Sequence, residues 1–380
     1  MARLGDVIKI KPSTASLKGE RIWLLNLDMV EQQTGCVFEH NFVNVEDLDG
    51  SIVQFDEDAV LYSKLRPNLN KVVLPDMAGF ATSEMLPLTP DTAVLTREYL
   101  AYFLRSDSFV TWAVSKTAGA KMPRLGSKEL LSKEIPLPTL GEQFSIAQQF
   151  VHVDTLISLR KQQLIKLDEL VKSRFVEMFG EPENNPKHWD KTSLSNVISS
   201  ANNGMARRGN DAEGSIVLRL AELQDGFIDY SSPNRIVLSE AEKKRYLLKN
   251  RDFLFARVNG NPENVGRCAE FSDIGEPVYH NDHIIRVHFD ENLINGCFAR
   301  ALLNSAYGKR QMAGQIKTSA GQYTINQEGI GAIVTVLPPL ELQNRFAAFV
   351  AEVDKSKLSV QQSIDQLETL KKSLMQKYFG

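Results

Sequence analysis

The stretch of sequence that decides the fold occurs twice. It reads PTLGEQFSIAQQFVHVDTLISLRKQQLIKLDELVKSRFVEMFG at residues 138–180 and PPLELQNRFAAFVAEVDKSKLSVQQSIDQLETLKKSLMQKYFG at residues 338–380. The two copies align without a gap, so that Pro138 matches Pro338 and Gly180 matches Gly380. Identical pairs between these ends include Gln143/Gln343, Ala147/Ala347, Asp154/Asp354, Leu167/Leu367 and Phe179/Phe379. An internal repeat of this kind divides the chain into two halves of similar plan.

Both copies have the pattern of a long helix. Each begins after a proline and then runs roughly 38 residues without Pro or Gly until its terminal Gly. Apolar residues recur at alternating spacings of four and three, as in Ile146, Phe150, Val153, Ile157 and in Phe346, Val350, Val353. This spacing is the a/d seam of a coiled coil. Two of the ten seam positions are charged in each copy, namely Arg160 and Arg174, then Lys357 and Lys371.

Two such seams in one chain most simply bury each other. Because a folded segment separates the copies, we expect the helices to pair in antiparallel orientation, each with a length of roughly 55 Å. Two alternatives stay open: each helix could pack on its own domain, or it could form an intermolecular coiled coil.

The segments before the helices are similar in plan. Residues 4–8 parallel 194–198, residues 21–25 parallel 215–219, and residues 58–64 parallel 251–257. Each half also contains a short helical stretch, at 98–106 and at 297–305. Short strands mixed with helices predict an α+β domain in each half. The expected segments are 1–140 and 181–338 for the two domains, and 141–180 and 339–380 for the two helices.

Polar loops at corresponding places in the two halves are the candidate functional segments. They are residues 64–71 and 257–267 after a predicted strand, and residues 117–124 and 318–326 before the repeat; 202–208 is a further loop. Arg, Lys and Asn side chains can donate hydrogen bonds to DNA phosphates and base edges. The alternative is that these segments are ordinary turns or linkers without a binding role. The candidate DNA-binding residues are Lys64, Arg66, Asn68, Lys71, Lys121, Arg124, Arg207, Arg208, Arg257, Asn259, Asn261, Arg267, Gln322 and Tyr323.

The overall charge argues against a simple DNA-binding protein. The net charge is −3 and the pI is about 6.1, whereas proteins that grip phosphates usually carry a basic excess. Residues 1–140 contain 15 Lys+Arg against 18 Asp+Glu, and residues 181–338 contain 18 against 19. The three cysteines, Cys36, Cys268 and Cys297, form no metal or disulfide pattern, which favours a reducing cytoplasm. We expect neither a signal peptide nor a membrane span.

The architecture resembles the specificity (S) subunits of type I restriction–modification systems. The family's signature before each helix, an apolar strand and then a Pro-Leu-Pro-Pro-x-x-Glu-Gln-like start, is similar to residues 135–143 and 336–343. One departure is Leu342, which stands where the first copy has Glu142.

The resemblance implies two target recognition domains, each reading half of a split, asymmetric sequence in double-stranded DNA. The two long antiparallel coiled-coil helices, related by a pseudo-two-fold internal repeat, would space the domains. They would also dock two methyltransferase subunits, which carry S-adenosylmethionine, and restriction (translocase) subunits would join. Because neither domain is basic, we expect weak DNA binding by the isolated chain.

The sequence offers no catalytic signature of its own. It lacks the Asn/Asp-Pro-Pro-aromatic motif of adenine methyltransferases and the phosphate loop of translocases. His280, His283 and His288 are the only histidine cluster; on one alternating strand His280 and His288 would share a face opposite His283, which is poor metal geometry. We therefore expect no metal and no cofactor on this chain. The rival hypotheses are a nuclease or methyltransferase with drifted motifs, a coiled-coil interaction protein without DNA specificity, and a specificity module of a related methyltransferase system.

Overall fold

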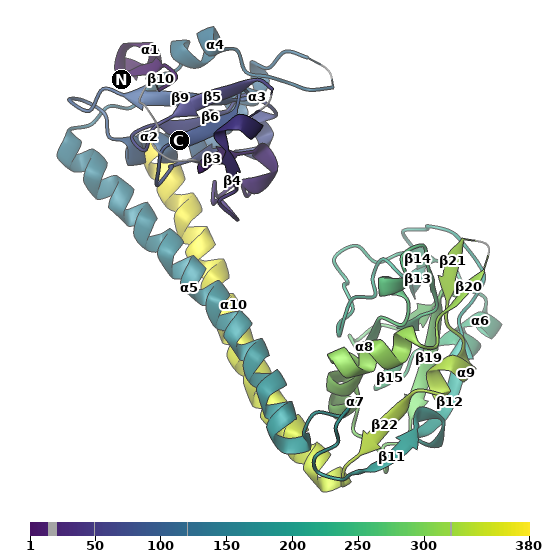
Figure 1. Cartoon of the computed structure of the whole chain (residues 1–380). Coiled ribbons are helices and arrows are strands. Elements are labelled where there is room, and N and C mark those ends of the chain that lie inside the picture. Colours follow the sequence, from purple (N-terminus) through teal and green to yellow (C-terminus); the bar gives the residue numbers. More distant parts are fainter. Residues whose placement is uncertain (14–20, 49, 120, 320) are drawn as a thin grey trace. The chain divides into compact units, whose positions relative to one another are not determined.

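The computed structural model describes residues 1–13, 21–48, 50–119, 121–319 and 321–380. The chain forms two compact units, which Figure 1 colours along the sequence. Unit 1 consists of Met1–Gln162 and Val360–Gly380, and unit 2 consists of Gln163–Ser359. Each unit combines small sheets and short helices with part of both long helices, so the mixed helix and sheet class predicted from the sequence is confirmed.

Unit 1 contains two four-stranded sheets. The first is antiparallel, in the order β2 (Ile8–Ile10), β9 (Met85–Pro90), β6 (Val60–Ser63), β7 (Val72–Val73). The second has the order β4 (Phe42–Asn44), β3 (Arg21–Leu25), β8 (Gly79–Thr82), β5 (Ile52–Phe55), with β3 and β8 parallel. A short pair joins β1 (Ala2–Arg3) to β10 (Glu134–Ile135). The short helices are α1 (Leu4–Val7), α2 (Arg97–Arg105), α3 (Asp107–Ser115) and α4 (Ser127–Ser132).

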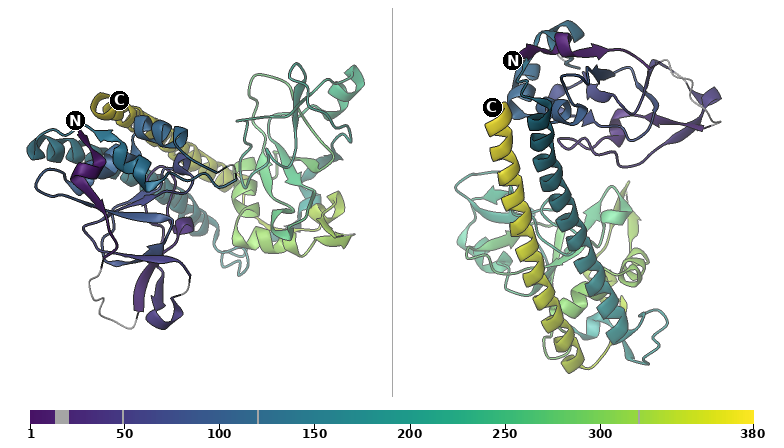
Figure 2. Two further views of the ribbon diagram at one scale, coloured as in Figure 1. Left: turned by 90° about the horizontal axis from the view of Figure 1, so that it is seen from above. Right: turned by 90° about the vertical axis from the view of Figure 1, so that its left-hand side faces the viewer.

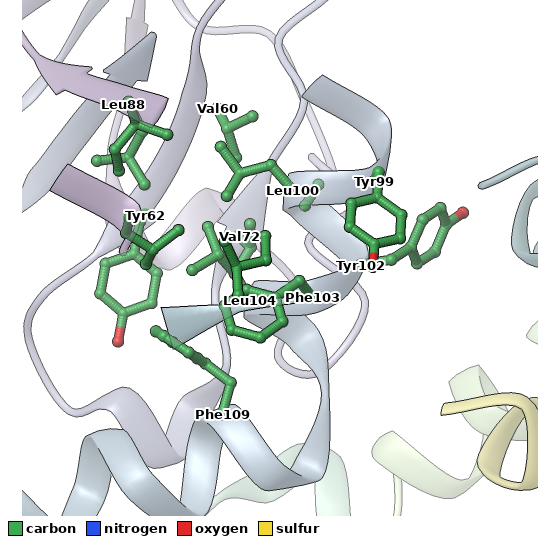
Figure 3. Close-up of a cluster of buried hydrophobic side chains, with 14 of the residues drawn as sticks. Val60, Tyr62, Val72, Leu88, Tyr99, Leu100, Tyr102, Phe103, Leu104 and Phe109 are labelled. Carbon is green, nitrogen blue, oxygen red and sulfur yellow. The ribbon is translucent and has the colours of Figure 1, made fainter. Parts of the chain in front are cut away.

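The core of unit 1 lies between the first sheet and helices α2 and α3. Figure 3 shows Val60, Tyr62 and Leu88 from the strands gathered against Leu100 and other residues of α2. Strands β6 and β9 are buried on both faces, which explains why their sequences are almost continuously apolar.

Unit 2 repeats this plan. Its antiparallel four-stranded sheet has the order β12 (Ile198–Asn203), β19 (Ile284–Phe289), β15 (Asp252–Ala256), β17 (Cys268–Glu270). A second sheet has the order β14 (Arg235–Ile236), β13 (Ser215–Leu218), β18 (Val278–His280), again with one parallel pair, β13 and β18. A third has the order β16 (Val258–Asn259), β21 (Gln322–Thr324), β20 (Lys317–Ser319), and β11 (Asp190–Ser193) pairs with β22 (Val334–Leu337). The short helices are α6 (Glu240–Tyr246), α7 (Gly296–Leu303), α8 (Ala306–Ala313) and α9 (Gln327–Gly331).

Backbone hydrogen bonds show that the correspondences predicted between the halves are correct. The Leu4 N–H donates to the Lys133 carbonyl, and the Leu194 N–H donates to the Ile333 carbonyl. The segments 21–25 and 58–64 form β3 and β6, and the segments 215–219 and 251–257 form β13 and β15. The two halves differ in most side chains but form equivalent strands and backbone hydrogen bonds, because backbone pairing depends little on side-chain identity.

The two repeats form α5 (Leu140–Phe179) and α10 (Leu340–Phe379), each an uninterrupted helix of 40 residues. Within each unit the two helices lie side by side, as Figure 2 shows. They run in opposite directions: in unit 1 Phe150 contacts Phe379, and in unit 2 Phe175 contacts Phe346. The predicted seam residues are buried or half-buried except Arg160, which is exposed.

The two lysines of the seam, Lys357 and Lys371, form ion pairs across the helices. Lys371 Nζ lies 2.6 Å from Asp154 Oδ1 in unit 1, and Lys357 Nζ lies 2.5 Å from Asp168 Oδ1 in unit 2. The second oxygen of Asp154 accepts a hydrogen bond from the Tyr102 hydroxyl, at 3.1 Å. A lysine at a seam position, paired with an aspartate of the other helix, therefore specifies which turns of the two helices face each other.

The shared glutamine of the repeat ties each helix start to its domain. The Gln143 amide is fully buried; its oxygen accepts from the Thr96 N–H at 2.9 Å, and its nitrogen donates to the Val94 and Pro138 carbonyls. Gln343 makes the same three contacts, with the Asn295 N–H and the Leu293 and Pro338 carbonyls.

The departure at Leu342 has a local cause. In the first copy Glu142 accepts hydrogen bonds from the Thr139 N–H at 2.9 Å and from its hydroxyl at 2.7 Å. The second copy has Pro339 in place of Thr139, and proline has neither group. A glutamate would have nothing to cap there, and Leu342 instead packs against the apolar core of unit 2.

Candidate nucleic-acid interface

Two of the predicted loops meet at one edge of unit 1. Residues 64–71, after β6, lie against residues 117–124, of which Ala120 is outside the described residues. The Arg66 N–H donates to the Pro123 carbonyl at 2.8 Å, and the Leu125 N–H donates to the Lys64 carbonyl at 2.9 Å. Leu65 and Arg124 form an isolated β-bridge between these bonds. The fold thus joins two segments that sequence reasoning could only identify separately.

Unit 2 builds the same loop pair from its own residues. Strand β16 directly follows Arg257 and pairs with β21, which places Asn259 opposite Tyr323. The Ile325 N–H donates to the Arg257 carbonyl at 2.9 Å, as the Leu125 N–H does to Lys64. Lys64 is therefore equivalent to Arg257, and Arg66 to Asn259. The loop 318–326 contains Ala320, which is outside the described residues.

In unit 1, four predicted residues have exposed side chains: Arg66, Asn68, Lys121 and Arg124. Arg66 has a φ of 49°, a left-handed conformation that costs a non-glycine residue energy. The conformation is held because Pro67 is buried and the Arg66 N–H is bonded to Pro123. This backbone fixes the root of the Arg66 side chain at the surface.

Two predicted residues of unit 1 have internal partners. The Lys71 ammonium donates to the Leu27 carbonyl at 2.5 Å, and burial lowers its pKa. The Arg124 guanidinium donates to both oxygens of Glu84, with a shortest distance of 2.8 Å. The hydrogen bonds from Arg124 hold the pKa of Glu84 below its ordinary value. These contacts favour a role in shaping the loop pair.

In unit 2, amide and aromatic side chains lie on the paired strands. Gln322 is exposed, and Asn259 and Tyr323 are half-buried. The Asn259 side-chain oxygen accepts from the Asn261 N–H at 2.9 Å, and the Asn261 oxygen accepts from the Glu263 N–H at 3.0 Å. Both oxygens therefore shape the turn, which leaves the side-chain NH₂ groups as the donors for a ligand.

The remaining arginines of unit 2 lie elsewhere or have internal partners. Arg207 pairs with Glu242 at 3.1 Å, and Arg208 pairs with Asp282 at 2.7 Å. Arg257 donates to the Asp282 carbonyl at 3.1 Å. Arg267 is bonded to Gln224 and Asn264. The side chains of Arg207 and Arg208 are still about half exposed, at 48% and 53%. Only 25% of the Arg267 side chain is exposed.

Comparisons with known proteins show which proteins the chain resembles. Residues 2–169 match the type I restriction modification DNA specificity domain. The chain is 28% identical over 301 residues to the type I restriction enzyme StySPI specificity subunit of Salmonella potsdam, covering 75% of this chain and 65% of that protein. It is 23% identical over 299 residues to the EcoKI specificity subunit of Escherichia coli K12, covering 74% and 64%. Over about three quarters of its length, the chain is similar to specificity subunits of type I restriction enzymes. The alignments span slightly less than two thirds of these two relatives.

Two solved structures share the fold of this chain. The S subunit of the type I restriction–modification system of M. genitalium is 15% identical, has a TM-score of 0.57, and is covered over 95% of its length. A chain from a study of complex assembly and conformational transition of the type I R-M system has a TM-score of 0.63 at 16% identity, with 96% of it covered. Both similarities extend over 100% of this chain.

Two further residues near the loop pairs were not identified from the sequence. Lys317 is exposed on β20, opposite Thr324 of β21, and it directly precedes the loop 318–326. Its charge and position were a usable signal. Gln33 has a φ of 67°, donates to the Asn68 carbonyl at 3.1 Å and accepts from the Asn70 amide. No sequence signal could have found it, because its partners lie some 35 residues further along.

The histidine expectation was wrong in its geometry. His280 ends β18 and His288 lies on β19, so the two residues belong to different sheets and share no alternating strand. Among the described residues no group of three or more His, Cys, Asp or Glu side chains is placed to hold a metal. Within that part of the chain no helix is long and apolar enough to cross a membrane.

Proposed function

We propose that this chain is the DNA-reading subunit of a type I restriction–modification enzyme, with one half of a split target read by each unit. The observation that carries the proposal is the loop pair. It is built twice on equivalent backbone hydrogen bonds, and its exposed positions carry guanidinium, ammonium and amide groups. The two copies differ in side chains, as two readers of different half-sites require.

The side chains suit different bases. Arg66 can donate two hydrogen bonds to the O6 and N7 of guanine in the major groove. Its equivalent Asn259, together with Gln322, has the amide group that pairs with the N6 and N7 of adenine. Lys121 and Lys317 are placed to contact phosphates, which position a protein without reading sequence.

Neither unit has a basic excess, so we propose that the methyltransferase subunits supply most of the phosphate contacts. A weak intrinsic affinity follows, because counterion release by Lys and Arg provides most non-specific binding. The chain acts without catalysis of its own in this proposal, and S-adenosylmethionine binds to the methyltransferase partners.

The outer side of α5 is the surface that we propose docks a partner. In unit 1, Phe144, Val151 and Leu159 are exposed, at 62%, 37% and 54%, and their spacing puts them on one stripe of the helix. In unit 2, Ile165 and Val176 are exposed on the same helix, at 59% and 40%. Exposed apolar stripes of this kind mark protein interaction sites.

A hybrid chain tests the proposal. Residues 1–137 are replaced by the corresponding domain of another type I specificity subunit, the hybrid is expressed with methyltransferase subunits, and methylated adenines are mapped across the host genome. We expect one half of the recognised sequence to change and the other to stay. The reciprocal replacement of residues 181–337 is the matched control and should change the other half. Changes in both halves from one replacement, or none from either, would contradict the proposal.

A further inference from the structure

Unit 2 contains a cavity of about 460 Å³ at the first turn of α7. The residues that line it include Arg251, Glu270, Glu291, Phe253, Phe289 and Gly296. Asn344 of α10 lines another side. None of these residues belongs to the loop pair, so the cavity is separate from the proposed DNA-reading surface.

The repeated fold shows what occupies the equivalent place in unit 1. The Thr96 N–H is bonded to Gln143 and the Asn295 N–H to Gln343, so the residues that follow, Arg97 and Gly296, are equivalent. The Arg97 side chain runs from the start of α2 toward the ends of β6 and β7. Its guanidinium donates to the Pro75 carbonyl at 2.9 Å and to the Glu57 carbonyl. Only 24% of that side chain is exposed.

Because Gly296 has no side chain, the space that the Arg97 side chain fills in unit 1 holds Glu270 and the cavity in unit 2. A Cβ added at Gly296 would lie 2.3 Å from Glu270 Oε1, so the carboxylate stands where the Arg97 side chain begins in unit 1. Glu270 is half-buried, and no described residue donates a hydrogen bond to it. Burial raises its pKa, while Arg300 and Arg251 oppose the shift. The neighbouring Glu291 already accepts a hydrogen bond from Arg251.

We propose that this cavity binds the guanidinium group of an arginine side chain presented by a partner protein. A guanidinium supplies the paired donors that the Glu270 carboxylate lacks. Arg97 provides a precedent within the chain for an arginine at this place. A protein is the expected source because α10 forms part of the rim. The choice of partner rests on the proposed function, in which the long helices dock methyltransferase subunits.

Titration of the full chain, without DNA, tests the site itself. The probe is N-acetyl-arginine methylamide, and its neutral isostere, the citrulline compound, is the control ligand; binding is measured by calorimetry. We expect saturable 1:1 binding of the arginine compound and at least tenfold weaker binding of the citrulline compound. Glu270→Gln should weaken arginine binding at least tenfold, whereas Glu213→Gln, an exposed acid elsewhere in unit 2, should not. Absence of arginine binding to the unaltered chain would overturn the site.

A second variant guards against a folding defect. Gly296→Arg gives unit 2 the arginine that unit 1 has, and the Glu270 side chain is flexible enough to turn aside. We expect this variant to keep the thermal midpoint and to lose probe binding, because its own guanidinium fills the cavity. Unchanged probe binding by a folded Gly296→Arg chain would also overturn the site.

Association with methyltransferase subunits tests the occupant. Measured by sedimentation, Glu270→Gln and Gly296→Arg should each weaken the complex at least tenfold relative to Glu213→Gln. If the unaltered chain binds the probe but both variants associate with methyltransferase subunits as tightly as Glu213→Gln does, the ligand is not an arginine of that partner. A free guanidinium compound would then be the ligand. If the unaltered chain did not associate with methyltransferase subunits, the proposed function would fail, while the titration would still decide the cavity.

Discussion

At the scale of single residues, Arg66 differs from Lys71 and Arg124, two other basic residues of its loop pair. Its backbone is fixed by the Pro123 carbonyl and by the buried Pro67, while its side chain is exposed. Lys71 and Arg124 are equally basic but are bonded to Leu27 and Glu84. The sequence shows three similar cations, and only the fold reveals that two of them have internal partners, because those partners lie about 40 residues away.

We expect Arg66→Ala to lower methylation of the target by roughly 10- to 100-fold, the loss of about 1–3 kcal/mol that one bidentate base contact supplies. Discrimination should relax at a single base pair. The measurement is the methylation map of a host that expresses the variant with its partner subunits. Lys128→Ala, which removes an exposed charge on α4, is the control and should leave the map unchanged. A uniform loss at every related sequence would assign Arg66 to the phosphates.

His280 makes unit 2 sensitive to acid. Its ring is fully buried, and burial, with Arg286 nearby, lowers its pKa to about 4, against 6.5 in the unfolded chain. Because the folded state disfavours the protonated ring, the stabilisation is complete above pH 6.5. It declines as the pH falls from 6.5 toward 4, by about 3 kcal/mol in all.

We therefore expect the urea midpoint of unfolding to fall over this range in the unaltered chain and to fall less in His280→Gln. His152→Gln, at an exposed histidine of α5, should follow the unaltered chain. Equal slopes in all three proteins would contradict the assignment.

At the scale of elements, the long helices were the most predictable part. Their bounds follow from the repeat, and the observed helices start at Leu140 and Leu340 and end before the matching glycines. The reading surface was less predictable. Its loops were identified, but the pairing of residues 64–71 with 117–124 depends on tertiary hydrogen bonds that no local pattern encodes. The cavity beside Gly296 could not be predicted from the sequence. It is recognised only when the fold shows that Gly296 is equivalent to Arg97 of the other half.

The buried glutamines connect helix and domain, which gives a prediction at this scale. Gln343→Ala removes hydrogen bonds to one N–H and two carbonyl groups and leaves them buried, so we expect a loss of about 2–4 kcal/mol in the free energy of unfolding. Gln143→Ala should cost a similar amount in unit 1. Glu142→Ala removes only an exposed cap and should cost clearly less than either glutamine substitution. Urea unfolding measures all three, and a Gln343→Ala loss no larger than that of Glu142→Ala would contradict the role.

At the scale of the whole molecule, the proposal makes the helices the ruler between half-sites. Removing four residues from each helix, about one turn, shortens each by about 6 Å, which is near two base pairs of DNA. We expect the methylated target to keep both half-sites and to change only its spacer. Substituting four exposed helix residues without a deletion is the control. An unchanged spacer in a folded, active deletion variant would show that the helices do not set the interval.

The division of the helices between the units also has a consequence for how the protein is made. Phe379 packs against Tyr99, Phe103 and Phe150, so the core of unit 1 includes residues separated from it by all of unit 2. On the ribosome, unit 1 emerges first and is completed last. Unit 2 is contiguous and can fold while the second helix is still being synthesised. Until that helix is synthesised, the nascent amino-terminal half exposes the aromatic side chains of Tyr99, Phe103 and Phe150. We expect a chaperone to cover this surface.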